Sequence, residues 1–239
     1  MTRSADIPWK RLSVEVVVIV SSILLAFWID AWWDDRSDAV QQRALLEALA
    51  EDFRTARDEF ESTRNGHKLV FQSMEQILHW AEAGSVPEEE RQDVDGRLSH
   101  FFWRQTFDPA MGAVDTILAS GRLDLLTNSS LVSELTRWKS LVSDLKGREN
   151  DAVEHFYEVI YPFLSARLRI QDLDKDIPYP GGLPWPQQPT EAHLLMADRE
   201  FHNIVYVHWV LHWNIDQRLP RVDAALDRIL TLAQDELKR

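Results

Sequence analysis

The sequence contains no cysteine, which excludes disulfide bonds, thiolate nucleophiles and thiolate metal ligands. Glycine is scarce, at 8 of 239 residues, and long glycine-poor stretches favour helices over turn-rich β structure. Basic residues are outnumbered, because 26 lysines and arginines stand against 39 aspartates and glutamates, and the formal net charge is −13. A chain this acidic is repelled by phosphate backbones, so the composition predicts no nucleic-acid partner.

Motifs for catalysis and cofactor binding are also missing. The chain has no glycine-rich phosphate loop, no nucleophile elbow and no HExxH zinc motif. We therefore predict that the protein is not an enzyme and has no catalytic residue and no cofactor. The candidate metal ligands are His208 and His212, whose i,i+4 spacing places two imidazoles on one helix face. Because zinc usually takes three or four ligands, packing is the favoured interpretation of this pair.

Apolar residues are abundant near the start of the chain. Residues 12–33 are almost uninterrupted apolar sequence. A helix of about 20 such residues crosses the roughly 30 Å of hydrocarbon in a bilayer. Trp28, Trp32 and Trp33 end the run, as expected where indole rings meet the boundary between lipid and water. The pattern predicts a transmembrane anchor over residues 12–33, with the lipid bilayer as a partner.

A cleaved signal peptide is the alternative for this run, because basic residues precede its apolar core. Cleavage needs small residues at two positions just after the core, and the sequence there reads Phe27-Trp28-Ile29-Asp30-Ala31. This mismatch favours an anchor that the mature chain retains.

The charges on either side of the run predict its orientation. Basic residues precede it and acidic residues follow: Arg3, Lys10 and Arg11 on one side, and Asp30, Asp34 and Asp35 on the other. By the positive-inside rule, residues 1–11 form a cytoplasmic tail and residues 34–239 an extracytoplasmic domain. We expect a single-pass protein of the bacterial inner membrane, with its C-terminal domain in the periplasm.

Glu15 is a charged residue within the predicted span, and two interpretations of it stay open. In the favoured one, Glu15 pairs with Arg11 at i,i+4 and both side chains reach outward to the headgroups. In the other, Glu15 is an intramembrane acid that binds a partner helix or carries a proton. Ser21 and Ser22 are small enough to allow close approach of a second span.

Residues 34–239 are predicted to form an all-α domain, an elongated antiparallel bundle of long helices. From Ser37 to Ala83 the chain has no proline and one glycine, and its inward positions recur every three or four residues. This seam consists of Leu45, Leu49, Phe53, Ala56, Phe60, Thr63, His67, Val70, Met74, Ile77 and Ala81. The span either continues directly into this helix or is separated from it by a break capped at Ser37 or Asp38.

Prolines, glycines and capping residues divide the rest of the chain. The predicted helices extend over residues 87–105, 108–118, 131–168 and 198–237. Gly121 should form a left-handed turn and Asn128 an N-cap, and Pro162 and Pro220 should bend the last two helices. The core between two helices is expected to be filled by three leucines, Leu123, Leu125 and Leu126. The inward stripe of the last helix is predicted to begin with Phe201, Ile204, Val207, Leu211 and Ile215.

Residues 170–191 are predicted to form a proline-rich loop that contains Tyr179 and Trp185. Exposed tyrosine and tryptophan side chains favour protein contacts. The alternative, which the sequence favours equally, is a structural crossover with Trp185 packed against the bundle.

Several of these features occur together: the run from Glu15 to Asp30 followed by Trp33, the apolar turn from Leu118 to Leu126 with Asn128, and the long terminal helix. In this combination the chain resembles a family of uncharacterised bacterial membrane-anchored proteins. The resemblance covers most of the chain and implies one N-terminal span followed by an extracytoplasmic helical domain, with no assigned activity. That family commonly has a glycine near Ser21 or Ser22 and an asparagine near Asp30, so the present chain departs from it at mid-span.

Two classes of function follow from the sequence. The favoured one is a membrane-anchored helical scaffold that assembles with itself or with other membrane-protein subunits. The alternative is an extracytoplasmic ligand sensor, or a channel-like homo-oligomer that uses Glu15 in the span. For either class we expect the interaction residues to be Glu15, Trp28, Trp32, Trp33, Tyr179 and Trp185.

Overall fold

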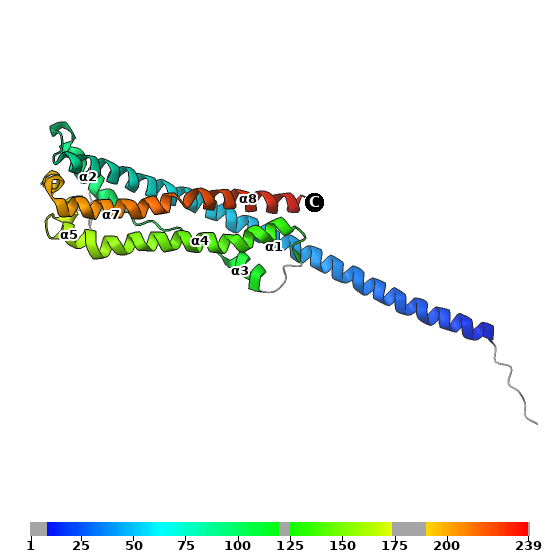
Figure 1. Cartoon of the computed structure of the whole chain (residues 1–239). Coiled ribbons are helices and arrows are strands. Elements are labelled where there is room, and N and C mark those ends of the chain that lie inside the picture. Colours follow the sequence, from blue (N-terminus) through cyan, green and yellow to red (C-terminus); the bar gives the residue numbers. More distant parts are fainter. Residues whose placement is uncertain (1–8, 120–124, 174–189, 239) are drawn as a thin grey trace, which may run out of the picture.

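The computed structural model describes residues 9–119, 125–173 and 190–238, with the backbone alone for residues 9–14 and 16. The chain is all-α, and the described residues contain no β-strand. Long helices pack side by side into an elongated bundle, and the N-terminal half of the first helix projects from it (Figure 1). The predicted fold class is confirmed.

Helix α1 (Trp9–Ala83) is a single helix of 75 residues that includes both the predicted span and the first long helix of the domain. It has no break at Ser37 or Asp38, because no proline and only one glycine occur between its ends. Gly84 ends it with a φ of 67°. The backbone N–H of Ser85 donates to the carbonyl of Trp80, which completes a left-handed helix cap.

The predicted seam of α1 lies in the core. Leu49, Phe53, Phe60, Met74 and Ile77 are each at most 1% exposed. The ends of the seam, Leu45 and Ala81, are half-buried. The three- and four-residue spacing therefore located the inward face of the helix correctly over its whole packed length.

The helices are not all antiparallel to one another. Helix α4 (Ser129–His155) runs in the same direction as α1, and the rings of Phe53 and Trp138 lie 5.0 Å apart between centroids. Helices α7 (Arg199–Asp216) and α8 (Leu219–Leu237) run in the opposite direction, and Phe71 of α1 stacks on Trp209 of α7. The chain between α1 and α4 must therefore return along the bundle (Figure 1).

This return begins with the short helices η1 (Glu88–Asp93), α2 (Val94–Ser99) and η2 (His100–Phe102). The helix predicted to stop near Gln105 thus ends at Phe102. Helix α3 (Gly112–Ala119) replaces the helix predicted over residues 108–118. The start of that prediction was wrong because the N–H groups of Phe107 and Asp108 donate to Glu149 on α4 and Glu59 on α1. These hydrogen bonds hold the segment extended between two helices.

Asn128 caps α4 as predicted, since its side-chain oxygen accepts from the N–H groups of Ser130 and Leu131 at 3.0 and 3.3 Å. The helix predicted to reach Leu168 ends at Ser165. After α4 it continues through the π-helical turn η4 (Phe156–Ile160) and the short helix α5 (Tyr161–Ser165). Pro162, the residue predicted to bend this helix, lacks an N–H and lies in the first turn of α5, directly after the π-helical turn.

The predicted helix from Asp198 to Leu237 is two helices. Asp198 caps α7, and Pro220 lies in the first turn of α8, where its missing N–H costs nothing. The inward stripe of α7 also differs from the prediction, because Val207 is 45% exposed. The buried positions are Phe201, Val205, His208, His212 and Ile215.

The remaining predictions concern the segments that connect the helices. Leu125 and Leu126 are buried as expected, whereas Gly121 and Leu123 lie outside the described residues. The predicted loop over 170–191 begins with the helical turn α6 (Ile170–Leu173), and the helix η5 (Ala192–Ala197) follows it. Tyr179 and Trp185 lie outside the described residues.

The buried apolar residues form two separate clusters. The proximal core, nearer the projecting part of α1, joins residues 46–60 of α1 to α3, α4 and α8. The distal core joins residues 70–80 of α1 to α2, η4, α5 and the start of α7. Between them, α1 presents Thr63 and His67 to the interior.

Replacement of Asn128 by alanine should lower the free energy of unfolding by about 1 kcal/mol, because two N–H groups at the start of α4 lose their acceptor. Chemical denaturation followed by circular dichroism measures this change. The matched control is Ser129→Ala at the neighbouring exposed position, which should change stability by less than about 0.5 kcal/mol. Equal effects at the two positions would contradict the capping role.

Candidate functional sites: an exposed apolar helix and a buried histidine layer

The first candidate site is the projecting part of α1. Its apolar stretch, from Val17 onward, is long and apolar enough to cross a membrane, and none of it is buried in the fold. Trp28 and Trp33 are each 66% exposed, and Trp32 is 51% exposed. A soluble protein rarely exposes so large a contiguous apolar surface, so this part of the helix has the properties of a membrane anchor. A signal sequence meets the same criteria of length and composition.

Glu15 is exposed near the start of this apolar stretch. The side chain of Arg11 lies outside the described residues, so the predicted Glu15–Arg11 pair stays a prediction. Ser22 donates its hydroxyl to the carbonyl of Val18 at 2.7 Å and is therefore satisfied within its own helix. Its small side chain leaves this face open to a second helix.

Between the apolar stretch and the bundle lies a short exposed part of α1, residues 34–44, with Asp34, Asp35 and Arg36 at its start. No described side chain of α1 before Leu46 is buried. Intrahelical contacts support this part, including Gln41 with Ser37 at 3.1 Å and Arg43 with Glu47 at 3.0 Å. The helix therefore runs from the apolar stretch into the proximal core with no hinge.

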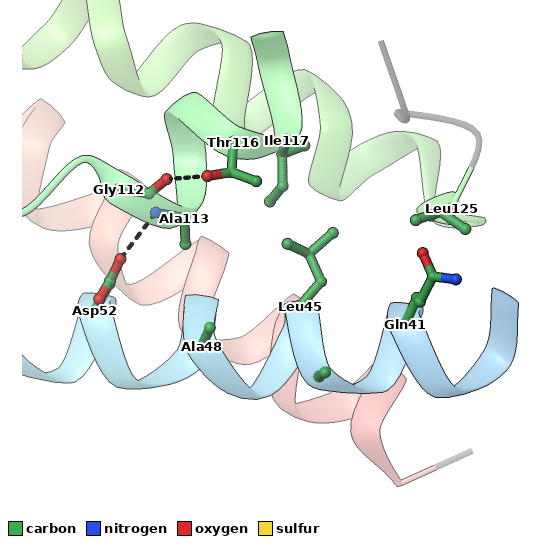
Figure 2. Close-up of a pocket in the computed structure, with 10 residues that line it drawn as sticks. Gln41, Leu45, Ala48, Asp52, Gly112, Ala113, Thr116, Ile117 and Leu125 are labelled. Atoms are coloured by element: carbon green, nitrogen blue, oxygen red, sulfur yellow. Dashed lines mark hydrogen bonds between the residues drawn. The ribbon is translucent and has the colours of Figure 1, made fainter. Parts of the chain in front are cut away.

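A cleft of about 660 Å³ opens beside this junction, between α1 and α3 (Figure 2). Leu45, Ala48 and Ile117 give it a largely apolar lining. The carboxylate of Asp52 accepts from the N–H of Ala113 at 3.1 Å at one side of the cleft. The volume of this cleft falls within the usual range of small-molecule pockets.

The second candidate site is a layer of polar side chains between the proximal and distal cores, which we call the histidine layer. Its members are His67 on α1, Glu149 and His155 on α4, and His208 and His212 on α7. Apart from the half-buried His155, these residues are buried. His208 and His212 lie on one helix face, as predicted, but that face points into the bundle.

The imidazoles of the layer contact one another directly. The rings of His155 and His208 stack 5.3 Å apart between centroids, and their Nδ1 atoms are 3.3 Å apart. The rings of His208 and His212 meet edge to face with their centroids 4.7 Å apart. The centroids of the His67 and His212 rings are 5.5 Å apart. Among the described residues, no group of three or more histidine, aspartate or glutamate side chains is arranged to hold a metal ion.

Glu149 connects the layer to the returning chain. Its Oε1 lies 3.0 Å from Nε2 of His67, and its Oε2 accepts from the N–H of Phe107 at 3.0 Å. Both carboxylate oxygens are therefore engaged in the interior. The sequence analysis identified His67, His208 and His212 but missed His155 and Glu149, although an acid between Leu145 and Ala152 on the inward stripe was a usable signal.

Burial determines the charge state of the other histidines. Burial first, and then the neighbouring His155, lower the pKa of His208 to about 3. The pKa of His212 is well below its ordinary value, first because of burial and then because of His208 and His67. Partial burial also lowers the pKa of His155. These three imidazoles are neutral at pH 7.

A small cavity of about 10 Å³ lies within the layer, bordered by His67, His212, Arg104 and Gln105. Nδ1 of His212 and Oε1 of Gln105 are buried without a hydrogen-bond partner. The side chain of Gln105 reaches this cavity because position 66 of α1 is a glycine. A Cβ atom on Gly66 would lie 2.3 Å from Oε1 of Gln105. The volume suffices for about one water molecule, which is the usual partner of such atoms.

Replacement of Glu149 by alanine should destabilise the fold by about 3 kcal/mol, because His67 and the N–H of Phe107 lose a buried partner. Thermal and urea unfolding measure the loss. The matched control is Glu154→Ala, which removes an exposed acid from the same helix and should have little effect. Similar losses in the two variants would show that the buried contacts of Glu149 contribute nothing.

The fold and these sites define an all-α protein with one helix able to cross a membrane and a polar layer inside its bundle. Comparison of the chain with protein-family models, curated proteins and solved structures finds no match.

Proposed function

We propose that this protein is a membrane-anchored helical scaffold that holds an interaction domain at a fixed distance from the bilayer. The observation that carries the proposal is the continuity of α1, which is exposed and apolar at one end and the central packing helix of the bundle at the other. A hinge-free connection fixes the direction of the bundle relative to its anchor. From Trp33 to Ala83 the helix is about 75 Å long at about 1.5 Å per residue.

The charges around the anchor support the orientation in this proposal. Basic residues precede it and acidic residues follow, so the tail of residues 1–11 stays in the cytoplasm and the bundle faces the periplasm of a bacterium. The exposed rings of Trp28, Trp32 and Trp33 then lie at the outer boundary of the bilayer. The lack of matched catalytic motifs is in keeping with a binding role.

The scaffold recruits other membrane-protein subunits or further copies of itself. Small residues at mid-span offer one contact face within the bilayer. Tyr179 and Trp185, in the proline-rich segment, are the residues we propose for contacts outside it.

A second candidate function is a ligand sensor or channel-like homo-oligomer. The observations that favour it are the apolar cleft between α1 and α3 and the exposed acid Glu15 in the span. In this case the cleft takes an apolar ligand, or several spans bring their Glu15 side chains together around a common axis.

Native mass spectrometry of the full chain in detergent, combined with affinity purification from its own membrane, tests these functions. The scaffold predicts recovery of one defined set of membrane-protein partners, which Glu15→Gln leaves intact. The channel-like alternative predicts a fixed homo-oligomer that Glu15→Gln disrupts. A reporter fused to the C-terminus tests the orientation, and activity inside the cytoplasm would contradict it.

A further inference from the structure

The histidine layer is the junction between the two cores of the bundle. His208 joins three elements there, because its ring stacks on His155 of α4, meets His212 of α7 and lies 5.8 Å from Phe101 of η2. Phe101 belongs to the distal core. The contact between His155 and His208 therefore holds the middle of α7 against the end of α4, immediately before the π-helical turn η4.

This contact depends on an unprotonated Nδ1. Two Nδ1 atoms 3.3 Å apart form a hydrogen bond only if one carries a proton and the other does not. Uptake of one proton by each neutral ring removes the acceptor and leaves two cations stacked at 5.3 Å, one of them buried. Protonation of both rings thus turns an attraction between α4 and α7 into a repulsion.

The charged groups around the contact do not compensate for such a proton. From α1 the nearest group is His67, which faces Glu149 of α4. The second oxygen of Glu149 is occupied by the N–H of Phe107. From the segment after η2, Arg104 brings a further positive charge to the same cavity. Of the acids nearest to His155 along the chain, Asp151 of α4 pairs with Arg148, and Glu154 of α4 and Glu158 of η4 are exposed to solvent.

From this arrangement we infer that the His155–His208 contact is an acid-sensitive switch. Proton uptake separates α7 from η4 and opens the distal core, while the proximal core stays packed. His208 contacts Phe101 of the distal core, whereas the junction of the proximal core with α8 is made by apolar side chains and by ion pairs such as Arg64 with Asp223. Acid therefore acts on one half of the bundle.

The direction of the pH dependence follows from the lowered pKa values of His155 and His208. An opened distal core returns each ring to its ordinary pKa of 6.5, so the open form binds more protons than the closed form. The closed form is fully favoured above pH 6.5 and loses stability as the pH falls below it. At pH 5.5 the proton taken up at His208 favours opening by about tenfold, and the lowered pKa of His155 adds to this effect.

Hydrogen–deuterium exchange of the full chain in detergent micelles, at pH 7.5 and 5.5 and corrected for intrinsic exchange, tests the switch. Amide protection should fall by about tenfold to a hundredfold in distal segments 94–102 and 192–205. In proximal segments 46–60 and 219–233 it should change by less than threefold. An equal loss in both halves, or no loss in either, would overturn the inference.

Two variants assign the effect to the contact itself. His208→Phe and His155→Gln each remove one titrating ring and should each reduce the acid-induced loss of distal protection, by about tenfold in His208→Phe. His79→Gln, at an exposed histidine of α1, is the matched control and should leave the loss unchanged. If His208→Phe does not fold, the half-buried His155 still provides the test. A full acid response in His155→Gln would refute the switch.

Discussion

Replacement of Phe53 by aspartate should unfold most of the bundle. Phe53 is 1% exposed and its ring packs on Trp138 with centroids 5.0 Å apart. The substitution removes an aromatic side chain, which costs about 3–5 kcal/mol on its own, and adds a carboxylate with no partner in an apolar core. The total loss approaches the whole stability of an ordinary domain, which is about 5–15 kcal/mol.

Circular dichroism during heating measures this loss directly. Thr55→Asp is the matched control, because Thr55 lies two residues further along the same helix and is exposed. We expect the control to melt within a few degrees of the parent chain. Unchanged melting of Phe53→Asp would mean that the seam of α1 faces solvent.

Removal of residues 1–36 should convert a protein integral to the membrane into a soluble one. All apolar residues of the exposed stretch precede Ser37, whereas every described buried residue of α1 lies at Leu46 or beyond. The shortened chain therefore loses its exposed apolar surface and none of its core. Insertion of a transmembrane helix is effectively irreversible, so the shift in partitioning should be nearly complete.

Membrane flotation after alkaline washing, with circular dichroism of the soluble product, measures both effects. The full chain carrying Val40→Asp is the control, since Val40 is 64% exposed beyond the predicted span and should not affect anchoring. The shortened chain should remain strongly helical. A shortened chain that still floats with membranes, or a full chain that stays in the wash, would contradict the anchor.

The helical content and the seam were predictable because both depend on local sequence. The absence of proline between Trp9 and Ala83 permits one helix, and recurrence every three or four residues identifies its inward face. The cap at Asn128 was predictable for the same reason, since its acceptor lies within three residues of the donors. Contacts between residues this close in the sequence can be predicted from the identities of those residues alone.

The two candidate sites differ in the same way, because one depends on local sequence and the other on tertiary contacts. The exposed apolar stretch with its tryptophans was visible in the sequence, because length and composition define it. The histidine layer could be predicted from the sequence only in part. The i,i+4 spacing showed that His208 and His212 share a face, but Val207 had been placed on the inward stripe of α7 and is exposed instead. Hydropathy alone cannot assign a histidine to the core, because its cost of burial depends on the partners it meets.

The sequence by itself determined that this protein is helical, that it carries an apolar stretch able to cross a membrane, and which face of α1 is buried. Only the tertiary structure decided that α4 runs parallel to α1, that residues 103–111 return as an extended strap, and that His67, Glu149, His155 and His208 meet in one layer. The physical reason is distance along the chain. His67 and Glu149 are 82 residues apart, and their contact exists only once α1 and α4 have both packed against α7 and α8.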